Sequence, residues 1–431
     1  MIDVVSINEI YHEVITVNTV NILENIRQCL VKILPIKDGR TDSSPLEFVV
    51  AFIFSFIGDT KILSIEGLRR GMMNNLSKPM SRSSFWERLS RKRHLSFLEL
   101  ILSELMKQLS APLLIGDSIL KQLCVTEICL VDSTSIKLPS WASKFFRGTG
   151  SAAAVKWHTC IDVFSGMLRW SQITSGRTYD RKCFPEIASF IGKLLIMDLG
   201  YWDYGLLQDI ENAGGFYLSR LRNDAEIIIK EIVQGGLCKK FIGTSLLKVC
   251  GRTNRGGIIE VYCDHVGKES ILRLRVIGFW NPIELRYHWY VTNLKVVASA
   301  IYTLYRLRWQ IELMFEGCKQ SLRLDDITSG DKNIIKSLLF GSLVAQLISQ
   351  TILRSAMSKL SEEKKFAVSY QRISNVFVNI SRHIVTFLLN NCKNNLDLLV
   401  IKIELFTNEL FDPNYRNRKS SVARIQEVLN A

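Results

Sequence analysis

The hydrophobic pattern changes twice along the chain and divides it into three regions. Up to about residue 125, apolar residues recur every three or four positions, as is typical of helices. Short apolar runs of strand length begin at Ile128, and helical spacing returns at about Val297 and continues to the end. We therefore predict a helical N-terminal domain, an α/β domain and a helical C-terminal region, at 1–125, 126–325 and 326–431.

The middle region predicts five strands. They are expected at 128–132, 155–163, 167–174, 194–198 and 216–221. A hairpin is indicated by Phe164-Ser165-Gly166, one helix is expected to begin near Asp180, and a second is expected over 204–213. Residues 223–293 alternate in places and predict a β-rich insertion before the helix that closes the domain. This order of elements indicates a mixed α/β sheet with an insertion.

The charge of the chain favours a polyanionic partner. Lys and Arg number 55 against 41 Asp and Glu, which gives a net charge of +14. Nucleic acid and an anionic membrane both fit this excess. Two apolar runs, 46–58 and 334–353, are candidates for membrane spans. The first is too short and the second is interrupted by polar residues, so we predict core helices and no membrane contact.

Half of the excess charge lies between residues 61 and 94, which contain nine Lys or Arg and two Glu. We expect a nucleic-acid-binding patch here, although a solvated charged face would have the same composition. The patch comprises Arg69, Arg70, Arg82, Arg88, Arg91, Lys92 and Arg93, with Phe85 and Trp86 between them.

The same stretch contains a helix-start signal. Ser84 precedes Glu87 by three residues, which predicts a capping box.

Cysteine usage and the N-terminus indicate a reducing compartment. Ten cysteines occur without a CxxC pair or a His at zinc-finger spacing, so neither a zinc site nor a secreted disulfide framework is indicated. The first residues lack the basic start and cleavage site of a signal peptide. We therefore expect a cytoplasmic protein.

Two Asp residues follow buried apolar runs. Asp132 ends the run that begins at Ile128, and Asp198 ends the run that begins at Leu194. Side chains at the carboxyl ends of neighbouring strands face one crevice, where open α/β sheets bind ligands. A single strand-end Asp also commonly caps a turn, so the pair suggests a site without proving one.

A later segment places charged residues along one side of a predicted helix. At about 100° per residue, Tyr305, Arg308, Glu312 and Lys319 fall within one arc of about 60° that borders the apolar face. Arg308 and Glu312 also have the spacing of an ordinary ion pair on a helix surface. The alternative is chemical, because a carboxylate holds a metal while neighbouring cations bind phosphate. Three converging acids would suit Mg²⁺.

The spacing of these four residues resembles the Y-x2-R-x3-E-x6-K signature of bacterial insertion-sequence transposases of family four. The segment Leu130 to Thr134 resembles the one that holds the first catalytic Asp of that family, and Asp198-Leu199-Gly200-Tyr201 resembles the Asp-Arg-Gly-Tyr box. Leu199 stands where the family has Arg, which puts a phosphate contact in doubt but not the metal ligand. Weaker similarities are Lys156 with His158, Thr178 to Asp180, and Phe216 to Arg220, and the resemblance covers about 128–325.

The resemblance implies a DDE transposase with a ribonuclease H-like fold. Asp132, Asp198 and Glu312 would be the catalytic metal ligands, for two Mg²⁺ ions with Mn²⁺ as a substitute. Such a protein would act in the bacterial cytoplasm at the nucleoid, as a homodimer on the inverted terminal repeats of a mobile element and on target DNA. It would cleave with activated water and then join the freed 3′-hydroxyl to the target. Four residues would contact DNA phosphates near the cut, namely Tyr305, Arg308, Lys319 and, as a weaker candidate, Arg220, while Arg91, Lys92 and Arg93 would recognise the element end.

Two other classes of function remain open at the level of sequence. One is a metal-dependent nuclease of the same fold that cuts but does not join strands. The other is a non-catalytic DNA-binding protein derived from a transposase, which the three intact acids argue against. Family members that form hairpins flip a base onto an aromatic ring. Trp280 and Trp289 are candidates for that role, with burial in the core as the alternative.

Overall fold

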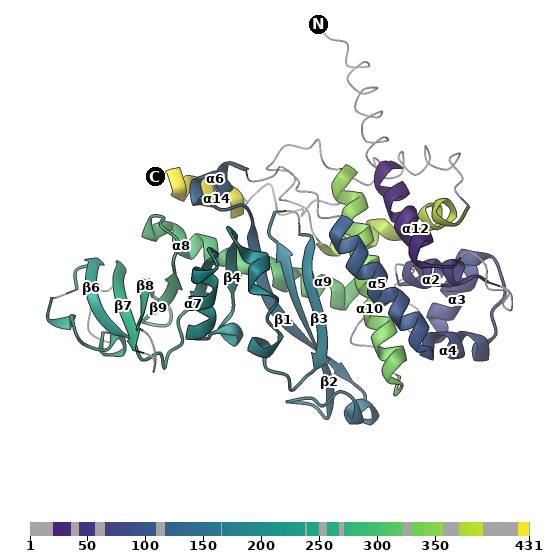
Figure 1. Cartoon of the computed structure of the whole chain (residues 1–431), viewed down its shortest axis with the longest axis horizontal. Coiled ribbons are helices and arrows are strands. Elements are labelled where there is room, and N and C mark those ends of the chain that lie inside the picture. Colours follow the sequence, from purple (N-terminus) through teal and green to yellow (C-terminus); the bar gives the residue numbers. More distant parts are fainter. Residues whose placement is uncertain are drawn as a thin grey trace, which may run out of the picture.

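A computed structural model shows one large sheet with helices at both ends of the chain (Figure 1). It describes residues 20–35, 43–56, 65–108, 117–164, 166–237, 239–249, 257–266, 271–321, 329–356, 370–390 and 421–430. The predicted helical character of 1–19 and 391–420 therefore lies outside the described residues.

The described part of the sheet has nine strands. In chain order they are β1 Ile128–Leu138, β2 Ala153–Asp162, β3 Leu168–Ser175, β4 Leu194–Met197, β5 Phe216–Arg220, β6 Ile228–Gln234, β7 Ile258–Val266, β8 Ile271–Asn281 and β9 Arg286–Thr292. Their spatial order is β3-β2-β1-β4-β5-β9-β8-β7-β6. β1 pairs antiparallel with β2 and parallel with β4, and β4 pairs parallel with β5. The first five strands thus have the ribonuclease H-like arrangement that the resemblance implies.

The predicted β-rich insertion extends this sheet. Its last strand, β9, pairs antiparallel with β5, where Leu218 to Arg220 face Tyr290 to Thr292. β8, β7 and β6 then follow as antiparallel neighbours. In Figure 1 these strands lie at the end of the molecule opposite the N-terminal helices.

Alternation along β1 supplies two cores, one on each face of the sheet. Ile128 and Leu130 join the core under the helices α5 (Lys92–Gln108), α9 (Trp309–Ser321) and α10 (Lys332–Ala356). Cys129 and Val131 join the core under α7 (Tyr204–Asn212). Because side chains alternate along a strand, the next residue, Asp132, lies on the same face as Ile128 and Leu130.

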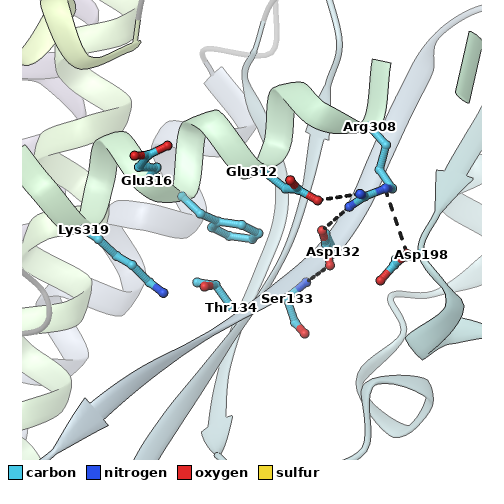
Figure 2. Close-up of a pocket in the computed structure, with 9 residues that line it drawn as sticks. Asp132, Ser133, Thr134, Asp198, Arg308, Glu312, Glu316 and Lys319 are labelled. Atoms are coloured by element: carbon cyan, nitrogen blue, oxygen red, sulfur yellow. Dashed lines mark hydrogen bonds and ion pairs between the residues drawn. The ribbon is translucent and has the colours of Figure 1, made fainter. Parts of the chain in front are cut away.

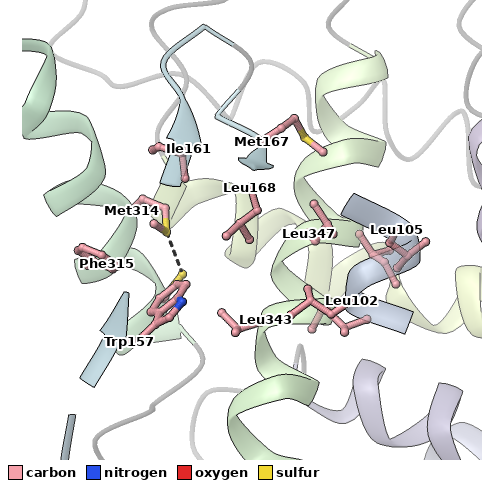
Figure 3. Close-up of a cluster of buried hydrophobic side chains, with 14 of the residues drawn as sticks. Leu102, Leu105, Trp157, Ile161, Met167, Leu168, Met314, Phe315, Leu343 and Leu347 are labelled. Carbon is pink, nitrogen blue, oxygen red and sulfur yellow. Dashed lines mark hydrogen bonds between the residues drawn. The ribbon is translucent and has the colours of Figure 1, made fainter. Parts of the chain in front are cut away.

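Large side chains fill the first core between the sheet and its helices (Figure 3). Trp157 of β2 meets Phe315 of α9 edge to face, with ring centroids 5.1 Å apart. Leu343 of α10 and Leu102 of α5 continue the same cluster. α9 is thereby fixed over β1 and β2, the strands beside the acidic residues.

Helices from both ends of the chain pack together. The remaining described α-helices with named bounds are α2 Pro45–Ser55, α3 Ile65–Leu76, α4 Arg82–Ser90, α6 Asp117–Leu123, α8 Ala298–Tyr305, α12 Tyr370–Asn390 and α14 Ser421–Asn430. The stretch Lys332–Ile352 is long and apolar enough to cross a membrane, but 89% of its most apolar window is buried inside the protein. It packs against α2, α4, α5 and α12, as expected for a core helix.

The structure corrects two local predictions. The helix expected near Asp180 is replaced by two short 3₁₀ turns, η2 Asp180–Cys183 and η3 Ile187–Phe190. Pro185 lies between them and cannot donate a helical hydrogen bond. The predicted capping box at Ser84 is also wrong. The α4 cap is Ser81, whose hydroxyl accepts a 3.1 Å hydrogen bond from the amide of Ser84.

Two predictions about the candidate site also change. Asp132 does not end its strand, because β1 continues to Leu138 while paired with β2. The segment from Tyr305 to Lys319 is not one regular helix. α8 ends at Tyr305, a 3₁₀ turn η7 spans Arg306–Arg308, and α9 follows.

Candidate active site

Asp132 and Asp198 lie side by side where two strands part. The parallel pairing of β1 with β4 ends at Val131 and Met197, and the two Asp residues come next on each strand. β1 then stays with β2, where Asp132 faces Thr159, while the chain after β4 turns away. The sequence prediction that the two acids share one crevice therefore agrees with the structure, although the reason given for Asp132 was wrong.

The third acid approaches from the helix that covers this face. Asp132 is two residues after Leu130 and shares its face, under α9. Glu312 lies in the first turn of α9, and Arg308 ends the 3₁₀ turn before it. The three acids therefore come from three different elements, which Figure 2 shows converging on one point.

That point is the guanidinium of Arg308. Its Nη1 lies 3.1 Å from Asp132 Oδ2, its Nη2 lies 2.5 Å from Glu312 Oε1, and its Nε lies 4.0 Å from Asp198 Oδ1. Nε is buried without a hydrogen-bond partner. The Arg308–Glu312 ion pair that the helical spacing predicts is present. It belongs to a larger cluster in which one cation contacts three carboxylates.

Tyr305 and Lys319 complete the predicted stripe. Tyr305 is buried, with its hydroxyl 3.5 Å from Asp198 Oδ1. Lys319 Nζ donates a 2.9 Å hydrogen bond to the carbonyl of Ser135 on β1. All four residues of the spacing pattern thus face β1 and β4, despite the 3₁₀ turn within the segment.

A pocket of about 560 Å³ opens between β1 and α9. Both acidic and basic side chains line it (Figure 2). The lining residues are Asp132, Ser133, Thr134, Asp198, Arg308, Glu312, Phe315, Glu316 and Lys319.

Burial shifts the pKa of the Asp132 carboxyl group. The pKa of Asp132 is raised to about 6, mainly by burial and in smaller part by the nearby Asp198 and Glu312 carboxylates. The amide of Ser133, which donates a 2.7 Å hydrogen bond to Asp132, and the charge of Arg308 act in the opposite direction. A titratable group shifted in this way inside a cleft is typical of a functional site.

The donor set suits a hard divalent cation. Three carboxylates offer the oxygen ligands that Mg²⁺ prefers, and Arg308 balances only one of their three charges. Within the described residues, no three His, Cys, Asp or Glu side chains stand close enough together to enclose an ion as they are placed. All three acids nevertheless reach one cationic group, so the residues fit a metal site in which Arg308 moves aside.

The other predicted DNA-binding residues lie outside this pocket. Arg220 ends β5 one strand beyond Asp198, pairs with Tyr290 across the sheet, and has a buried Nε without a hydrogen-bond partner. Arg91, Lys92 and Arg93 are exposed at the junction of α4 and α5. The structure therefore brings six of the ten predicted residues together, places Arg220 close enough for its charge to act on Tyr305, and leaves Arg91, Lys92 and Arg93 apart.

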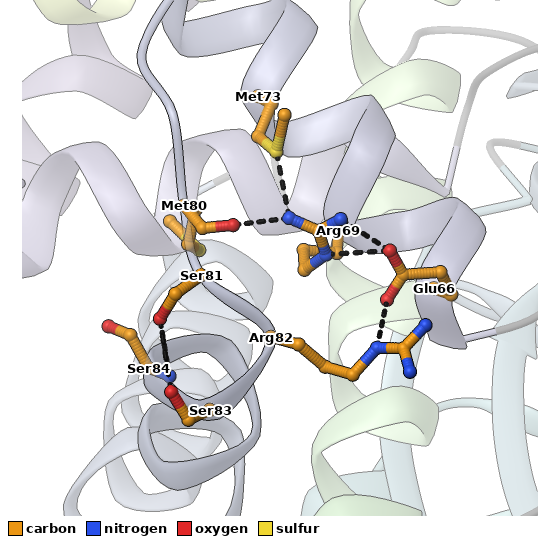
Figure 4. A network of polar contacts seen from close by, with 8 residues as sticks. All are labelled: Glu66, Arg69, Met73, Met80, Ser81, Arg82, Ser83 and Ser84. Atoms are coloured by element: carbon orange, nitrogen blue, oxygen red, sulfur yellow. Dashed lines mark hydrogen bonds and ion pairs between the residues drawn. The ribbon is translucent and has the colours of Figure 1, made fainter.

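Two cations of the basic patch have structural roles. Arg69 contacts Glu66 and the carbonyl of Met80, in a network that also includes Arg82 (Figure 4). Arg88 donates to Ser43 Oγ at 2.6 Å and stacks over the ring of Phe48 at 4.1 Å. The contacts of Arg69 and Arg88 within the N-terminal helices therefore explain why arginine occurs at these two positions.

Of the two Trp candidates in the insertion, Trp289 is a core residue. It is 8% exposed, and a Cβ added at Gly278 would lie 2.6 Å from its ring. Trp280 is partly buried against Tyr287, with ring centroids 5.2 Å apart. Only Trp280 keeps part of its side chain accessible.

The sequence analysis did not assign a role to Asp180. Its carboxylate accepts a 2.6 Å hydrogen bond from Ser133, the residue after Asp132, and pairs with Lys156 and His158 of β2. The available signal was the weak similarity at Lys156, His158 and Asp180, which the structure joins in one cluster.

Comparison with known proteins identifies the family. The family described as "Transposase DDE domain" matches residues 124–348, more than half of the 431 residues. The chain belongs to the DDE transposase family. DDE transposases are metal-dependent enzymes that cleave DNA and transfer strands. The narrower assignment to insertion-sequence family four, which depends on the four-residue spacing, stays a prediction.

Similar proteins include several insertion-sequence transposases. This DDE transposase is 25% identical over 328 residues to the transposase for insertion sequence element IS231E of Bacillus thuringiensis subsp. finitimus, covering 65% of this chain and 68% of that protein. It is 25% identical over 361 residues to the transposase of IS231B of Bacillus thuringiensis subsp. berliner, covering 73% and 74%. It is 23% identical over 284 residues to the transposase of IS1151 of Clostridium perfringens, covering 56% and 60%.

Among solved structures, a chain of a piggyBac transposase synaptic complex with hairpin DNA aligns with a TM-score of 0.44 and 9% identity. The alignment covers 89% of this chain and 82% of that chain.

Proposed function

We propose that this protein is the transposase of a bacterial insertion sequence, with Asp132, Asp198 and Glu312 as the ligands of two Mg²⁺ ions. One observation supports this assignment above the others. Carboxylates from β1, from the turn after β4 and from α9 all reach the Arg308 guanidinium. Residues so far apart in sequence converge in this way when a site needs several oxygen ligands at one point.

The metal ions would supply Lewis-acid stabilisation of the attacking and leaving oxygens of an in-line displacement, with Mn²⁺ as a substitute. Asp132, Asp198 and Glu312 would together hold the ions. Arg308 balances part of the acidic charge and would turn to a DNA phosphate when the acids engage the ions. Lys319 lines the pocket and Tyr305 lies beside Asp198, and both would hold neighbouring phosphates, with Arg220 beyond them.

The partners proposed are double-stranded DNA and a second copy of the chain. Two copies would each bind one terminal repeat through Arg91, Lys92 and Arg93, and the pair would then join both ends to target DNA. A protein with this function would act in the bacterial cytoplasm, on the nucleoid.

Substitution of each acid tests the assignment. Asp132→Ala, Asp198→Ala and Glu312→Ala should each abolish Mg²⁺-dependent cleavage of DNA that contains an element end, because each removes a metal ligand. Binding of the same DNA, followed by gel shift, should stay within about threefold of wild type, since phosphate contacts rather than these acids dominate affinity.

A matched control is Asp209→Ala, which removes an exposed carboxylate from α7, on the opposite face of the sheet from α9 and outside the pocket lining. Its cleavage rate should stay within about threefold of wild type, the range of a surface change. Wild-type cleavage by any of the three acid variants would overturn the assignment. Cleavage without joining in a strand-transfer assay would instead indicate a nuclease of the same fold.

A further inference from the structure

A second, largely buried cluster lies beside the candidate metal ligands. It is centred on Asp180, which begins η2 in the loop between β3 and β4. Ser133 Oγ donates to Asp180 Oδ1 at 2.6 Å, while Lys156 Nζ and His158 Nδ1 each lie 3.3 Å from the same oxygen. One carboxylate therefore ties its loop to both β1 and β2.

The partners of Asp180 are themselves held in place. His158 is fully buried, and its Nε2 lies 2.9 Å from the hydroxyl of Thr174 on β3. Tyr201, which is also buried, has its hydroxyl 3.5 Å from His158 Nδ1. A network with this many fixed members restricts where the Asp180 carboxylate can lie.

Asp180 also abuts the segment that carries the second acid. The turn η4 (Leu199–Tyr201) follows Asp198 directly, and a Cβ added at Gly200 would lie 2.8 Å from Asp180 Oδ2. The backbone of that turn thus packs against the carboxylate, and a larger residue at position 200 would push the carboxylate aside. This gives a physical reason for glycine at position 200.

These contacts bridge a gap in the sheet. The pairing of β1 with β4 ends at Val131 and Met197, just before the two acids. Asp180 touches the residue after Asp132 and the turn after Asp198, and so joins the two segments beyond the last pair.

We propose that Asp180 is a positioning residue, which fixes the separation of the Asp132 and Asp198 carboxylates for a divalent cation. The inference deepens the proposed function and rests on it. Asp180 faces β1 and β2 through its hydrogen bonds and does not line the pocket, so its effect passes through Ser133 and Gly200.

The test is Asp180→Asn, which keeps the shape of the side chain and removes its charge. Mn²⁺ affinity, measured by calorimetry on the full chain, should fall about 10- to 100-fold, the usual effect of losing a group that orients metal ligands. The cleavage rate at saturating DNA should fall to a similar extent, with the Kd for DNA within about twofold. The matched control is Asp209→Asn, which removes an exposed carboxylate from α7 and leaves η2, β1 and β2 unchanged. It should keep the Mn²⁺ affinity of wild type.

A double-mutant cycle separates positioning from general stability. Gly200→Ala should weaken Mn²⁺ binding in the wild-type background but much less beside Asp180→Ala, because the methyl group then meets no carboxylate. If Asp180→Asn unfolds, Ser133→Ala replaces it, since it cuts the link to β1 and leaves the carboxylate. Unchanged Mn²⁺ affinity in these variants, beside a wild type that binds Mn²⁺ and cleaves DNA, would overturn the positioning role alone. A wild type that neither binds Mn²⁺ nor cleaves would overturn the proposed function and this inference together.

Discussion

At the scale of the residue, Asp132 has a buried carboxylate whose pKa of about 6 lies above the ordinary value for Asp. Between about pH 4 and pH 6 the folded protein therefore holds a proton that the unfolded chain has released. The stability that this group contributes is fully present below pH 4 and is lost as the pH rises through 6. Above pH 6, the charged Asp132 carboxylate lowers the free energy of unfolding by roughly 3 kcal/mol, the equivalent of a shift of about two pKa units.

Asp132→Asn should therefore stabilise the fold while it abolishes cleavage. At pH 7.5 the free energy of unfolding should rise by about 1–3 kcal/mol, because the neutral amide avoids the cost of a buried charge while Arg308 keeps Glu312 and Asp198. Urea denaturation at pH 7.5 and at pH 5 measures the effect, which should shrink at pH 5, where Asp132 is already protonated. The Asp198 side chain is more exposed than that of Asp132. Asp198→Asn should therefore change the free energy of unfolding by less than about 0.5 kcal/mol. Equal gains for Asp132→Asn at both pH values would contradict this account.

At the scale of the element, helix α10 packs tightly against α2. A Cβ added at Gly341 would lie 2.6 Å from the Phe52 ring and 2.8 Å from the Phe56 ring. Gly341→Ala should lower the free energy of unfolding by about 1–3 kcal/mol, since overpacking outweighs the better helix propensity of alanine. Thermal and urea denaturation measure this loss.

The control for this contact is Gly150→Ala, where an added Cβ meets nothing within 4 Å. Its stability should stay within about 0.5 kcal/mol of wild type. Phe52→Leu should recover part of the loss in the Gly341→Ala background, because the smaller side chain makes room. If Gly341→Ala were as stable as wild type, α2 and α10 would be able to accommodate the added methyl group without loss of packing.

Local pattern predicted the strands well because alternation and apolar runs are properties of neighbouring residues. It failed where the outcome depends on distant partners. β1 continues past Asp132 because β2 keeps pairing with it, and the partner of Asp132, Thr159, lies 27 residues further along the chain. Ser81 and Ser84 are equivalent as caps in sequence, and only the fold selects Ser81. The helix near Asp180 was a failure of local interpretation, since Pro185 was already visible.

The candidate site divides in the same way. The spacing of Tyr305, Arg308, Glu312 and Lys319 is local and indicated that these residues share one side. That Asp132 meets Asp198 follows from β1 lying next to β4, which no stretch of sequence reports. The Asp180 cluster draws on β1, β2 and two loops, so it becomes visible only once the strand order is known.

At the scale of the whole molecule, the net charge of +14 is not equally available to a polyanion. Arg69 and Arg88 are engaged in packing the N-terminal helices, whereas Arg91, Lys92 and Arg93 are exposed. Arg91 still pairs with Glu87, although both side chains are more than half exposed, so this ion pair is weak. The exposed group is therefore the part of the basic patch that can bind DNA phosphates.

Changing Arg91, Lys92 and Arg93 to Gln should weaken binding to DNA and flatten its salt dependence. Each phosphate contact contributes about 0.9 to the slope of log K against log salt, so the loss of three contacts should reduce the slope by about 2 to 3. Fluorescence anisotropy across a salt series measures it. The matched control changes Lys230, Lys239 and Lys240 to Gln, which removes the same charge from the exposed far edge of the insertion. Equal slopes for the two triple variants would mean that total charge rather than this surface governs binding, and an unchanged slope for the first would identify its cations as a solvated face.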